Sequence, residues 1–237
     1  MNRQIRKRRL LFLKTEKKNS FSAAFFGLIT LLIYSNVFSS EKLSRYEALS
    51  GRKLQDSKSE WDQKFLSEKY IFGKTPAKFL KENAHLINKR SKVLDMGMGE
   101  GRNAVFLATK GHNVIGIDIS SVAIEKANAL AQEFSTQIKG VVASLDNYQI
   151  KEGSFDVILA FYYVDRNLID KMKSWLKPGG LIFYEANTVE KLKEGKLIDK
   201  SYLVEKGEIK RFFHEMKILK FEEPNDGSYR SSIVVRK

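Results

Sequence analysis

Residues 93–120 read VLDMGMGEGRNAVFLATKGHNVIGIDIS, and this stretch decides the fold class. The apolar run at its start has the composition of a buried β-strand and ends at Asp95. Three glycines follow at alternate positions: Gly97, Gly99 and Gly101. They allow a tight turn and expose bare main chain to a ligand before a helix that begins at Arg102. A second strand-like run ends at Asp118. This order of elements predicts an α/β domain with a ligand on the glycine loop.

The rest of the chain continues the alternation of strands and helices. Strand-like runs occupy residues 92–95, 113–118, 138–143, 155–161 and 181–185, and helical runs occupy residues 102–110, 122–134 and 168–176. Two further β runs near the C-terminus are joined by Pro-Asn-Asp-Gly, which predicts an antiparallel hairpin. We therefore predict a doubly wound, Rossmann-like α/β fold: a mostly parallel seven-stranded sheet with a C-terminal antiparallel hairpin.

The charges around the loop distinguish between two kinds of nucleoside ligand. Residues 99–104 also fit the G-x-G-x-x-A fingerprint of dinucleotide-binding loops. A dinucleotide would place its pyrophosphate beside Asp95 and Glu100, and one like-charge contact at ~4 Å costs about 4 kcal/mol at an effective dielectric of ~20. S-adenosylmethionine (SAM) carries ammonium and sulfonium groups and no phosphate, so Asp95 becomes a favourable contact. We predict SAM as the cofactor and keep an NAD-dependent oxidoreductase as a minor alternative.

Several motifs, taken in order, resemble those of the class I SAM-dependent methyltransferases. They are D-x-G-x-G-x-G after VL, the acid at the end of the next strand, SLD at 144–146, FDVIL at 155–159 and LKPGG at 176–180. The resemblance covers about residues 60–237. More narrowly, GRNAVFLATKGHNVIGIDIS, FYYVDR and the ending VEKGEIKRFFHEMKILKFEE are similar to the tellurite-resistance type of small-molecule methyltransferases.

The resemblance implies roles for the residues of the glycine loop and the next strand. Asp95 and Gly97 would lie near the methionine part of SAM, and Gly99 and Gly101 would shape the turn. Asp118 would bind the ribose hydroxyls. Both SAM and a dinucleotide need an acid at this place, and a simple loop cap remains the structural alternative for Asp118.

The resemblance also implies contacts to the adenine and a lid. Leu145 would lie beside the adenine ring, and Asp146 would reach its amino group. The segment 61–73 resembles the N-terminal lid of the family, in which Tyr70 and Phe72 would cover the cofactor. The sequence leaves open that Asp146 only caps a loop and that the lid segment is a helix packed on the sheet.

Candidates for the acceptor pocket follow the fourth and fifth strands, because ligands bind at the carboxyl ends of such strands. They are Tyr162, Tyr163, Asp165 and Arg166 after one strand and Glu185 after the next. The tyrosines could line an apolar pocket and contact the sulfonium by cation–π attraction, or they could be core aromatics. Arg166 could clamp an anionic acceptor or pair with Asp165. A general base is required only if the acceptor arrives protonated.

Cysteine and histidine provide few candidates for catalytic or metal-binding roles. The chain has no cysteine, which excludes disulfides, thiolate metal sites and a cysteine nucleophile. No metal site is predicted. We interpret His85 and His112 as structural because they fall far from the carboxyl ends of the strands. His214 is the one histidine that could reach the pocket, and a surface position is the alternative.

The N-terminus carries a second signal. Residues 1–20 form a basic tail, and residues 21–38, FSAAFFGLITLLIYSNVF, contain no charge. A helix of this length would span about 27 Å, close to the ~30 Å hydrocarbon core of a bilayer. We predict an N-terminal hydrophobic helix at 21–38 as a membrane anchor, with a cleaved signal segment as the alternative. Residues 39–59 are expected to be a linker, and residues 60–237 the SAM-dependent methyltransferase domain.

The distribution of charge bears on partners and location. Residues 1–40 hold eight Lys/Arg and one Glu, so half of the formal charge of +14 belongs to the tail. The remaining cations are scattered among acids, so no nucleic-acid partner is expected. The positive-inside rule favours a non-cytoplasmic domain after a single N-terminal pass, whereas the supply of SAM favours a cytoplasmic one. The sequence thus predicts a membrane-tethered enzyme that methylates a small-molecule acceptor, with a non-catalytic SAM-binding module as the alternative.

Overall fold

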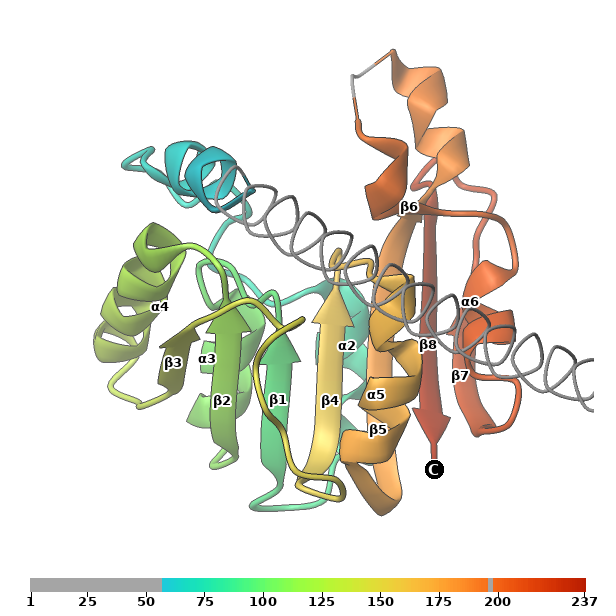
Figure 1. Ribbon diagram of the computed structural model, residues 1–237, viewed down its shortest axis with the longest axis horizontal. Coiled ribbons are helices and arrows are strands. Elements are labelled where there is room, and N and C mark those ends of the chain that lie inside the picture. The colour runs from blue at the N-terminus through green and yellow to red at the C-terminus, as the bar shows by residue number, and fades with distance from the viewer. Residues whose placement is uncertain (1–56, 196–197) are drawn as a thin grey trace, which may run out of the picture. The chain divides into compact units, whose positions relative to one another are not determined.

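The computed structural model describes residues 57–195 and 198–237 (Figure 1). The basic tail, the apolar segment 21–38 and most of the predicted linker lie outside these residues. The described part begins three residues before the predicted start of the domain at 60. Within it, every helix is too short or too polar to cross a bilayer.

One mixed sheet organises the described residues (Figure 1). The strands lie in the order β3-β2-β1-β4-β5-β8-β7. Their bounds are β1 Lys92–Met96, β2 Asn113–Asp118, β3 Lys139–Val142, β4 Phe155–Phe161, β5 Leu176–Thr188, β7 Lys217–Glu222 and β8 Arg230–Arg236. The first five run parallel, and β8 pairs antiparallel with both β5 and β7. This confirms the predicted seven-stranded sheet and its hairpin. The short strand β6 (Leu203–Val204) pairs parallel with the end of β5 as an eighth strand.

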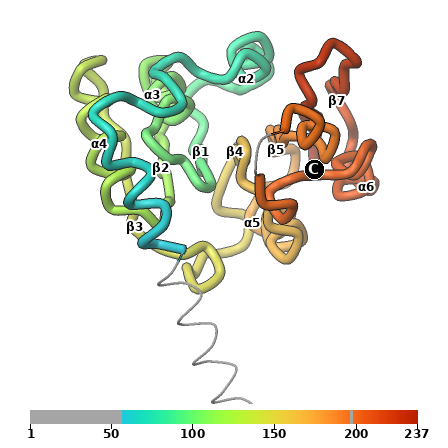
Figure 2. Tube along the Cα trace, turned by 90° about the horizontal axis from the view of Figure 1, so that it is seen from above, coloured from blue at the N-terminus to red at the C-terminus, as the bar shows by residue number. Residues whose placement is uncertain are grey.

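The helices alternate with these strands as the sequence predicts. Residues 57–65 are helical, and the other α-helices are α2 (Lys78–Asn83), α3 (Arg102–Thr109), α4 (Ser121–Glu133), α5 (Ile169–Trp175) and α6 (Glu208–Phe212). Short 3-10 turns are η1 (Ala84–Leu86), η2 (Arg166–Leu168), η3 (Val189–Glu194) and η4 (Lys200–Tyr202). Helices α2 and α3 lie on one face of the sheet and α5 on the other (Figures 1 and 2).

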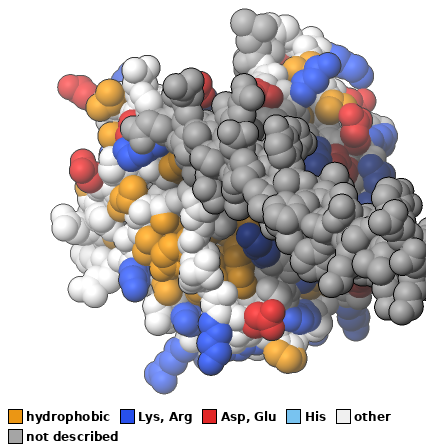
Figure 3. Space-filling view, viewed as in Figure 1, with side chains coloured by type: hydrophobic (Ala, Val, Ile, Leu, Met, Phe, Trp, Pro, Cys, Tyr) orange, Lys and Arg blue, Asp and Glu red, His pale blue; other side chains and the backbone are white. Residues whose placement is uncertain are grey.

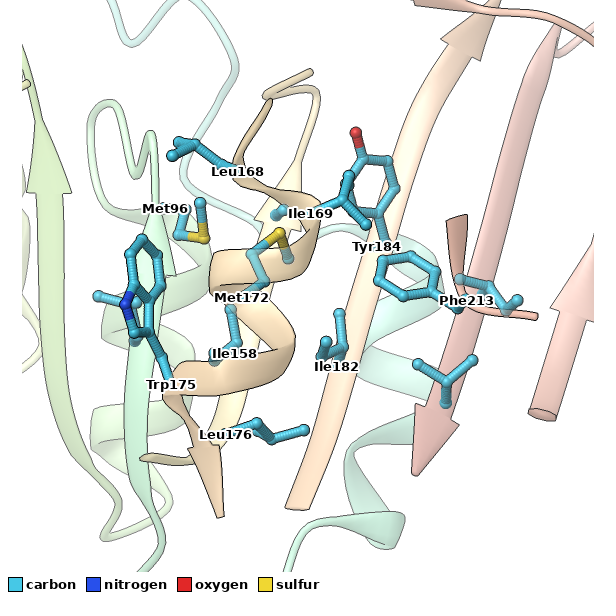
Figure 4. Close-up of a cluster of buried hydrophobic side chains, with 14 of the residues drawn as sticks. Met96, Ile158, Leu168, Ile169, Met172, Trp175, Leu176, Ile182, Tyr184 and Phe213 are labelled. Carbon is cyan, nitrogen blue, oxygen red and sulfur yellow. The ribbon is translucent and has the colours of Figure 1, made fainter. Parts of the chain in front are cut away.

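The core has two layers because β4 is buried on both faces. Its alternate residues point to opposite sides, so Val157 packs in the cluster of α2 and α3, and Ile158 packs in the cluster of α5. Figure 4 shows the second cluster, in which Met172 and Trp175 of α5 lie over the sheet. Burial on both faces explains why the strand reads as a continuous apolar run.

The connection between β3 and β4, residues 143–154, contains turns and no helix. Tyr148 and Ile150 of this connection pack only partly buried against the α5 cluster, together with Ile115 and Val141 of the adjacent strands. Figure 3, seen from the same side as Figure 1, shows hydrophobic side chains at the surface of this face. The connection begins at the carboxyl end of β3 and carries Leu145 and Asp146 to the edge of the sheet that holds the glycine loop.

Candidate functional site

The site lies at the carboxyl ends of β1 and β4, which are neighbours in the sheet. The chain leaves β1 through α3 on one face and β4 through α5 on the other, so their shared end is the topological switch point where such folds bind ligands. The glycine loop occupies this place. Its three glycines have positive φ, of 60° at Gly97, 54° at Gly99 and 84° at Gly101. Side chains other than glycine rarely adopt this conformation.

Two of the three glycines are also required by packing. A Cβ atom at Gly97 would lie 2.5 Å from Cδ2 of Tyr163, and one at Gly101 would lie 2.7 Å from Cβ of Ala127. At Gly99 the nearest atom would be the Phe65 ring at 3.5 Å, an ordinary contact distance. The loop is therefore clamped at both ends, while its middle faces Phe65 of the preceding helical segment.

Asp118 is held by the backbone of the glycine loop. Its Oδ2 accepts a hydrogen bond from the Gly99 N–H at 2.8 Å, and its Oδ1 accepts one from the Ser120 N–H at 2.9 Å. Burial raises the pKa of this carboxyl, and the backbone donors oppose that change. Each oxygen keeps a second lone pair, so the oriented carboxylate can still accept from two neighbouring hydroxyls.

Asp95 presents a buried carboxylate oxygen to the same space. Its side chain is 2% exposed, and Oδ2 has no hydrogen-bond partner among the described residues. Burial raises the pKa of Asp95 to about 7, Arg102 acts against this increase, and Asp118 adds to it. A buried acceptor without a donor is costly unless a ligand supplies one. An ammonium group is the donor that best fits a carboxylate.

Leu145, Asp146 and Tyr163 close the other side of this space. Leu145 is buried, whereas Asp146 is exposed and lies close enough to Asp165 to raise its pKa. Burial is the main cause of the raised pKa of the Tyr163 phenol, and Asp165, Asp146 and Asp118 add to it. Tyr163 therefore lies between Asp118 on one side of this space and Asp146 and Asp165 on the other. Tyr163 thus lies near Gly97, Asp118 and Asp146, for which methionine, ribose and adenine contacts are predicted.

Tyr162 adopts an unusual backbone conformation, with a φ of 60°. Two bonds to one residue hold it: its N–H donates to the Glu185 carbonyl at 2.7 Å, and its hydroxyl donates to Glu185 Oε1 at 2.6 Å. The Ser232 hydroxyl donates to the other carboxylate oxygen at 2.7 Å. Burial, followed by Glu185, raises the pKa of Tyr162. Neither tyrosine is therefore poised to act as a base near neutral pH.

Arg166 pairs with Glu208 and not with Asp165, and its predicted role as a clamp for an anionic acceptor stays a prediction. Its Nε donates to Glu208 Oε1 at 2.7 Å and its Nη2 to Oε2 at 3.1 Å, and Nη2 also reaches the Leu203 carbonyl at 3.0 Å. Asp165 instead accepts from the Asn167 N–H at 2.9 Å. The guanidinium holds residues 201–208 against η2. The predicted pairing of Arg166 with Asp165 is therefore wrong. Its Nε and Nη2 donate to protein groups and not to a methyl acceptor.

Tyr70 also differs from its predicted position over the cofactor. Its hydroxyl donates to the Lys126 carbonyl at 2.9 Å, and its ring packs in the cluster of Leu130 and Ala131. It fastens the lid segment to α4. On the N-terminal side of the loop, Phe65 is the aromatic side chain nearest to Gly99, and it packs edge to face with Phe72 at 6.3 Å between ring centroids.

A buried ion pair links the lid segment to the loop. Lys126 of α4 pairs with Glu100, which stands between two of the loop glycines, and its Nζ donates to the carbonyls of Phe65, Ser67 and Lys69 at 3.3, 2.8 and 3.0 Å. Glu100 is 3% exposed and also accepts from the Phe72 N–H at 3.3 Å. One lysine therefore contacts both the loop and the segment that covers it.

A cleft of about 670 Å³ opens beside this group. Its lining comes from residues 60–72, from Arg102 and Tyr162, and from residues 187–203. Sequence reasoning identified Tyr162 but not Trp61, Tyr202 or Arg102. The basic residue directly after the last loop glycine was visible in the sequence, whereas the contribution of residues 187–203 depends on the chain folding back over the end of β5.

Comparisons with known proteins agree with this geometry. Residues 93–180 match a family described as a methyltransferase domain. The ribosomal RNA small subunit methyltransferase C of Alcanivorax borkumensis is 31% identical over 114 residues, 44% of this chain and 34% of that protein. The ubiquinone biosynthesis O-methyltransferase of Paraburkholderia phymatum is 30% identical over 113 residues, 45% of this chain and 48% of that protein. The chain thus spans about a third to a half of the length of these curated relatives.

Among solved structures, the N-methyltransferase NodS from Bradyrhizobium japonicum, in complex with S-adenosyl-L-homocysteine, superposes with a TM-score of 0.59. The two chains are 16% identical, and the match covers 76% of this chain and 97% of NodS. At this identity the likeness concerns the fold.

Residues 93–180 thus match a methyltransferase domain, set in the fold of the SAM-dependent methyltransferases.

This identification confirms the predicted family and SAM as its cofactor. The residues present fit that cofactor, because Asp95 offers an unpartnered buried carboxylate oxygen and the loop glycines leave bare backbone beside Asp118. The narrower tellurite-resistance type stays a prediction.

The histidines lie away from this group. The rings of His85 and His214 each contact a carbonyl three residues earlier in the chain, and both side chains are exposed, as the sequence allowed. Burial lowers the pKa of His112. In the part of the chain that the structure describes, no cluster of three or more His, Asp or Glu residues is arranged to hold a metal ion.

Proposed function

We propose that the protein is a SAM-dependent methyltransferase that acts on a small-molecule acceptor. The observation that carries this proposal is the position of the aromatic cleft directly beside the glycine loop. Arg102, which lines the cleft, follows Gly101, and Tyr162, which also lines it, precedes the tyrosine packed on Gly97. Methyl transfer requires the cofactor and the acceptor to bind side by side, and the glycine loop and the cleft are adjacent.

The chain itself binds and orients, and SAM supplies the reactive group. When bound, SAM would supply an electrophilic methyl group, and its sulfur would keep the electron pair of the broken carbon–sulfur bond. Asp118 would hold the ribose and Asp95 the ammonium group. Phe65 and Phe72 would exclude water from the loop.

This chemistry requires no protein base for an acceptor that is already ionised or carries a free lone pair. The raised pKa values of Tyr162 and Tyr163 agree with such a mechanism. Glu185 holds two hydrogen bonds from protein side chains, so it positions Tyr162 rather than taking a proton from the acceptor. The tyrosines then act as walls that set the approach of the acceptor.

The decisive experiment separates binding from turnover. SAM binding is measured by calorimetry, and formation of S-adenosylhomocysteine is followed with panels of thiols, oxyanions, phenols and carboxylates. Binding with turnover of at least one acceptor supports an enzyme. Binding without turnover across all four panels supports the alternative, a SAM-binding module. Tight binding of NAD with no binding of SAM would contradict both and favour an oxidoreductase.

We further propose that residues 21–38 attach the domain to a membrane, on the grounds of their uncharged sequence and the eight cations before them. A protein with a C-terminal tag, expressed in cells, tests this by fractionation and by protease treatment of intact cells. Tag in the membrane fraction that is digested from outside supports an anchor with a non-cytoplasmic domain. A tag that is protected until lysis would place the domain on the cytoplasmic side. Intact protein in the soluble fraction would refute the anchor.

A further inference from the structure

The cleft beside the loop has the size and lining to choose a particular class of acceptor. Seven of its thirteen lining residues are aromatic or aliphatic, and its volume is about 670 Å³. Pockets of about 300–1,000 Å³ hold molecules of drug size. A small thiol or an inorganic oxyanion would leave most of this apolar surface in contact with water. The occupant must therefore bring apolar surface of its own.

Aromatic side chains from two distant segments form one wall of the cleft. Trp61 and Tyr202 meet edge to face, with ring centroids 6.0 Å apart and planes 83° apart. Trp61 in turn stacks on Phe65, at 5.7 Å and 25°. Rings in such arrangements present flat faces and edges that favour another ring in offset or edge contact. This wall selects a flat, conjugated molecule over a branched aliphatic one.

Arg102 supplies the polar contact. Its guanidinium carbon lies 5.7 Å from the centroid of the Tyr162 ring and 6.0 Å from that of the Phe72 ring, and one of its nitrogens donates to the Phe72 carbonyl at 3.0 Å. Burial raises the pKa of Asp95, and Arg102 opposes this rise without forming an ion pair with the carboxylate. Among the described residues no carboxylate lies within ion-pair distance of this guanidinium, so several of its donors remain available.

The remaining charges of the lining reinforce this preference only weakly. Lys64 lies over the Trp61 ring at 4.2 Å, and Lys191 makes a loose contact with Glu194 at 3.9 Å. The acids of the lining are Glu60 and Asp199, and Asp199 accepts from the Ser201 N–H at 2.8 Å as the cap of η4. Arg102 is thus the cation that lies between aromatic rings, where a charge-assisted hydrogen bond is stronger than in open water.

We infer that the acceptor is a flat aromatic molecule that carries an acid group, with its ring against Trp61 and Tyr202 and its acid on Arg102. This inference rests on the proposed function, because it names the substrate class of the same site. It goes beyond the general prediction of a small-molecule acceptor by excluding neutral phenols and small oxyanions as preferred ligands. Arg102, and not Arg166, then takes the anion-binding role.

The test measures binding to protein saturated with S-adenosylhomocysteine and, in parallel, to protein without it. Three probes separate the features: 3-hydroxy-2-naphthoate has ring and acid, 2-naphthol has only the ring, and cyclohexanecarboxylate has only the acid. We expect the naphthoate to bind at least tenfold more tightly than either of the others. Equal or tighter binding of 2-naphthol, or no binding of any probe, would overturn the inference.

A pair of matched variants assigns the preference to one side chain. In Arg102→Gln, the dissociation constants of the naphthoate and of 2-naphthol should differ by no more than about threefold. Lys110→Gln removes the same charge just after the far end of α3, outside the cleft, and should keep the tenfold preference. Circular dichroism and thermal unfolding of both variants check that they fold. Persistence of the preference in folded Arg102→Gln would refute the assignment.

A third variant addresses the wall. Tyr202→Ala should weaken the binding of the naphthoate and of 2-naphthol by similar factors and leave the binding of cyclohexanecarboxylate unchanged. An equal loss of binding for all three probes would contradict the ring contact. The result is separable from the proposed function. If S-adenosylhomocysteine binds and only neutral or inorganic acceptors are methylated, this inference fails and the methyltransferase stands. If SAM does not bind, the methyltransferase itself fails.

Discussion

The two sides of the site are built in different ways. On the cofactor side, residues 95–120 create the site with their own backbone: three glycines have positive φ, and two backbone N–H groups hold the Asp118 carboxylate. On the acceptor side, Arg102 and Tyr162 line the cleft together with side chains from residues 60–72 and 187–203, which meet only in the folded chain. A site made by backbone geometry tolerates few substitutions, whereas a side-chain wall can vary while the sheet persists. Substitutions on the two sides should therefore separate cofactor affinity from acceptor choice.

The largest effect is expected at Gly97. Gly97 and Gly153 share a φ of 60°, but a Cβ atom would meet the Tyr163 ring at 2.5 Å at Gly97 and nothing within 4 Å at Gly153. Alanine at Gly153 should cost roughly 1–2 kcal/mol of unfolding free energy through its left-handed backbone. Alanine at Gly97 should add roughly 1–3 kcal/mol of overlap and displace the loop, so that SAM binding is lost in calorimetry.

The pair of variants has a clear contradicting result. If Gly97→Ala binds SAM as Gly153→Ala does, the close contact between loop and Tyr163 is not needed for the cofactor. Gly99→Ala gives the intermediate case, because its Cβ would meet only Phe65 at an ordinary 3.5 Å.

Asp118→Asn should have the next largest effect. The amide oxygen can accept only one of the two backbone N–H groups that the carboxylate accepts now, and the amide NH₂ would face the other. SAM affinity should fall by ~1.5 to 3 kcal/mol, roughly tenfold to more than a hundredfold. Asp226→Asn is the matched control, since that carboxylate accepts from the Ser228 N–H at 2.9 Å in an exposed turn. An unchanged SAM dissociation constant in Asp118→Asn would remove Asp118 from the site.

Asp95 makes the cofactor side sensitive to pH. Its pKa in the folded protein is raised to about 7, so the folded state binds a proton that the unfolded state releases near pH 4. The contribution of Asp95 to unfolding free energy is therefore most favourable below pH 4 and is lost as the pH rises through about 7. An ammonium ligand requires the ionised form, so SAM should bind more tightly as the pH rises from 6 to 8.

Two measurements check the pH prediction. Urea unfolding from pH 5 to 8 should show a decline in stability that is smaller in Asp95→Asn. Calorimetry in buffers of different ionisation enthalpy should show proton release when SAM binds near pH 7. Proton uptake, or an equal pH slope in the parent and Asp95→Asn, would contradict the assignment.

The smallest effect on SAM affinity is expected from Tyr162, which lies on the acceptor side. Tyr162→Phe removes the donor to Glu185 Oε1 and should cost about 1–3 kcal/mol of unfolding free energy, because the carboxylate stays buried. Turnover should decrease while SAM affinity stays within a few fold, since the ring lines the acceptor cleft. Tyr148→Phe, in the β3–β4 connection, serves as control. Equal losses of SAM affinity and turnover would assign Tyr162 a folding role instead.

The sequence could predict the cofactor side because its information is local. Alternate glycines, an acid at a strand end and a helix directly after the loop impose one backbone path. The structure has this path, with positive φ at the three glycines and the Gly99 N–H donating to Asp118. The strand ends follow from apolar runs bounded by polar residues. Tyr163 was singled out for its position after β4, but its contact with Gly97 depends on the parallel pairing of β1 with β4.

The acceptor side could not be predicted in the same way because its contacts join distant segments. Arg166 meets Glu208, 42 residues later, in preference to its neighbour Asp165. Tyr70 meets Lys126 on α4, 56 residues later, so its aromatic character alone did not show which surface it covers. Pairings of this kind depend on how loops pack against each other, and the hydrophobic periodicity of the sequence does not predict them.

The ion pair between Lys126 and Glu100 has a consequence for kinetics. Moving residues 57–72 away from the loop breaks the bonds from Lys126 Nζ to the carbonyls of this segment and exposes a carboxylate that is now 3% accessible. The pair itself stays together, but both of its members lose hydrogen bonds to the segment, and this is costly until water replaces them. The barrier to exchange of the bound nucleoside thus includes the hydration of one lysine and one glutamate. We therefore expect this pair to affect the residence time of the nucleoside more than its affinity.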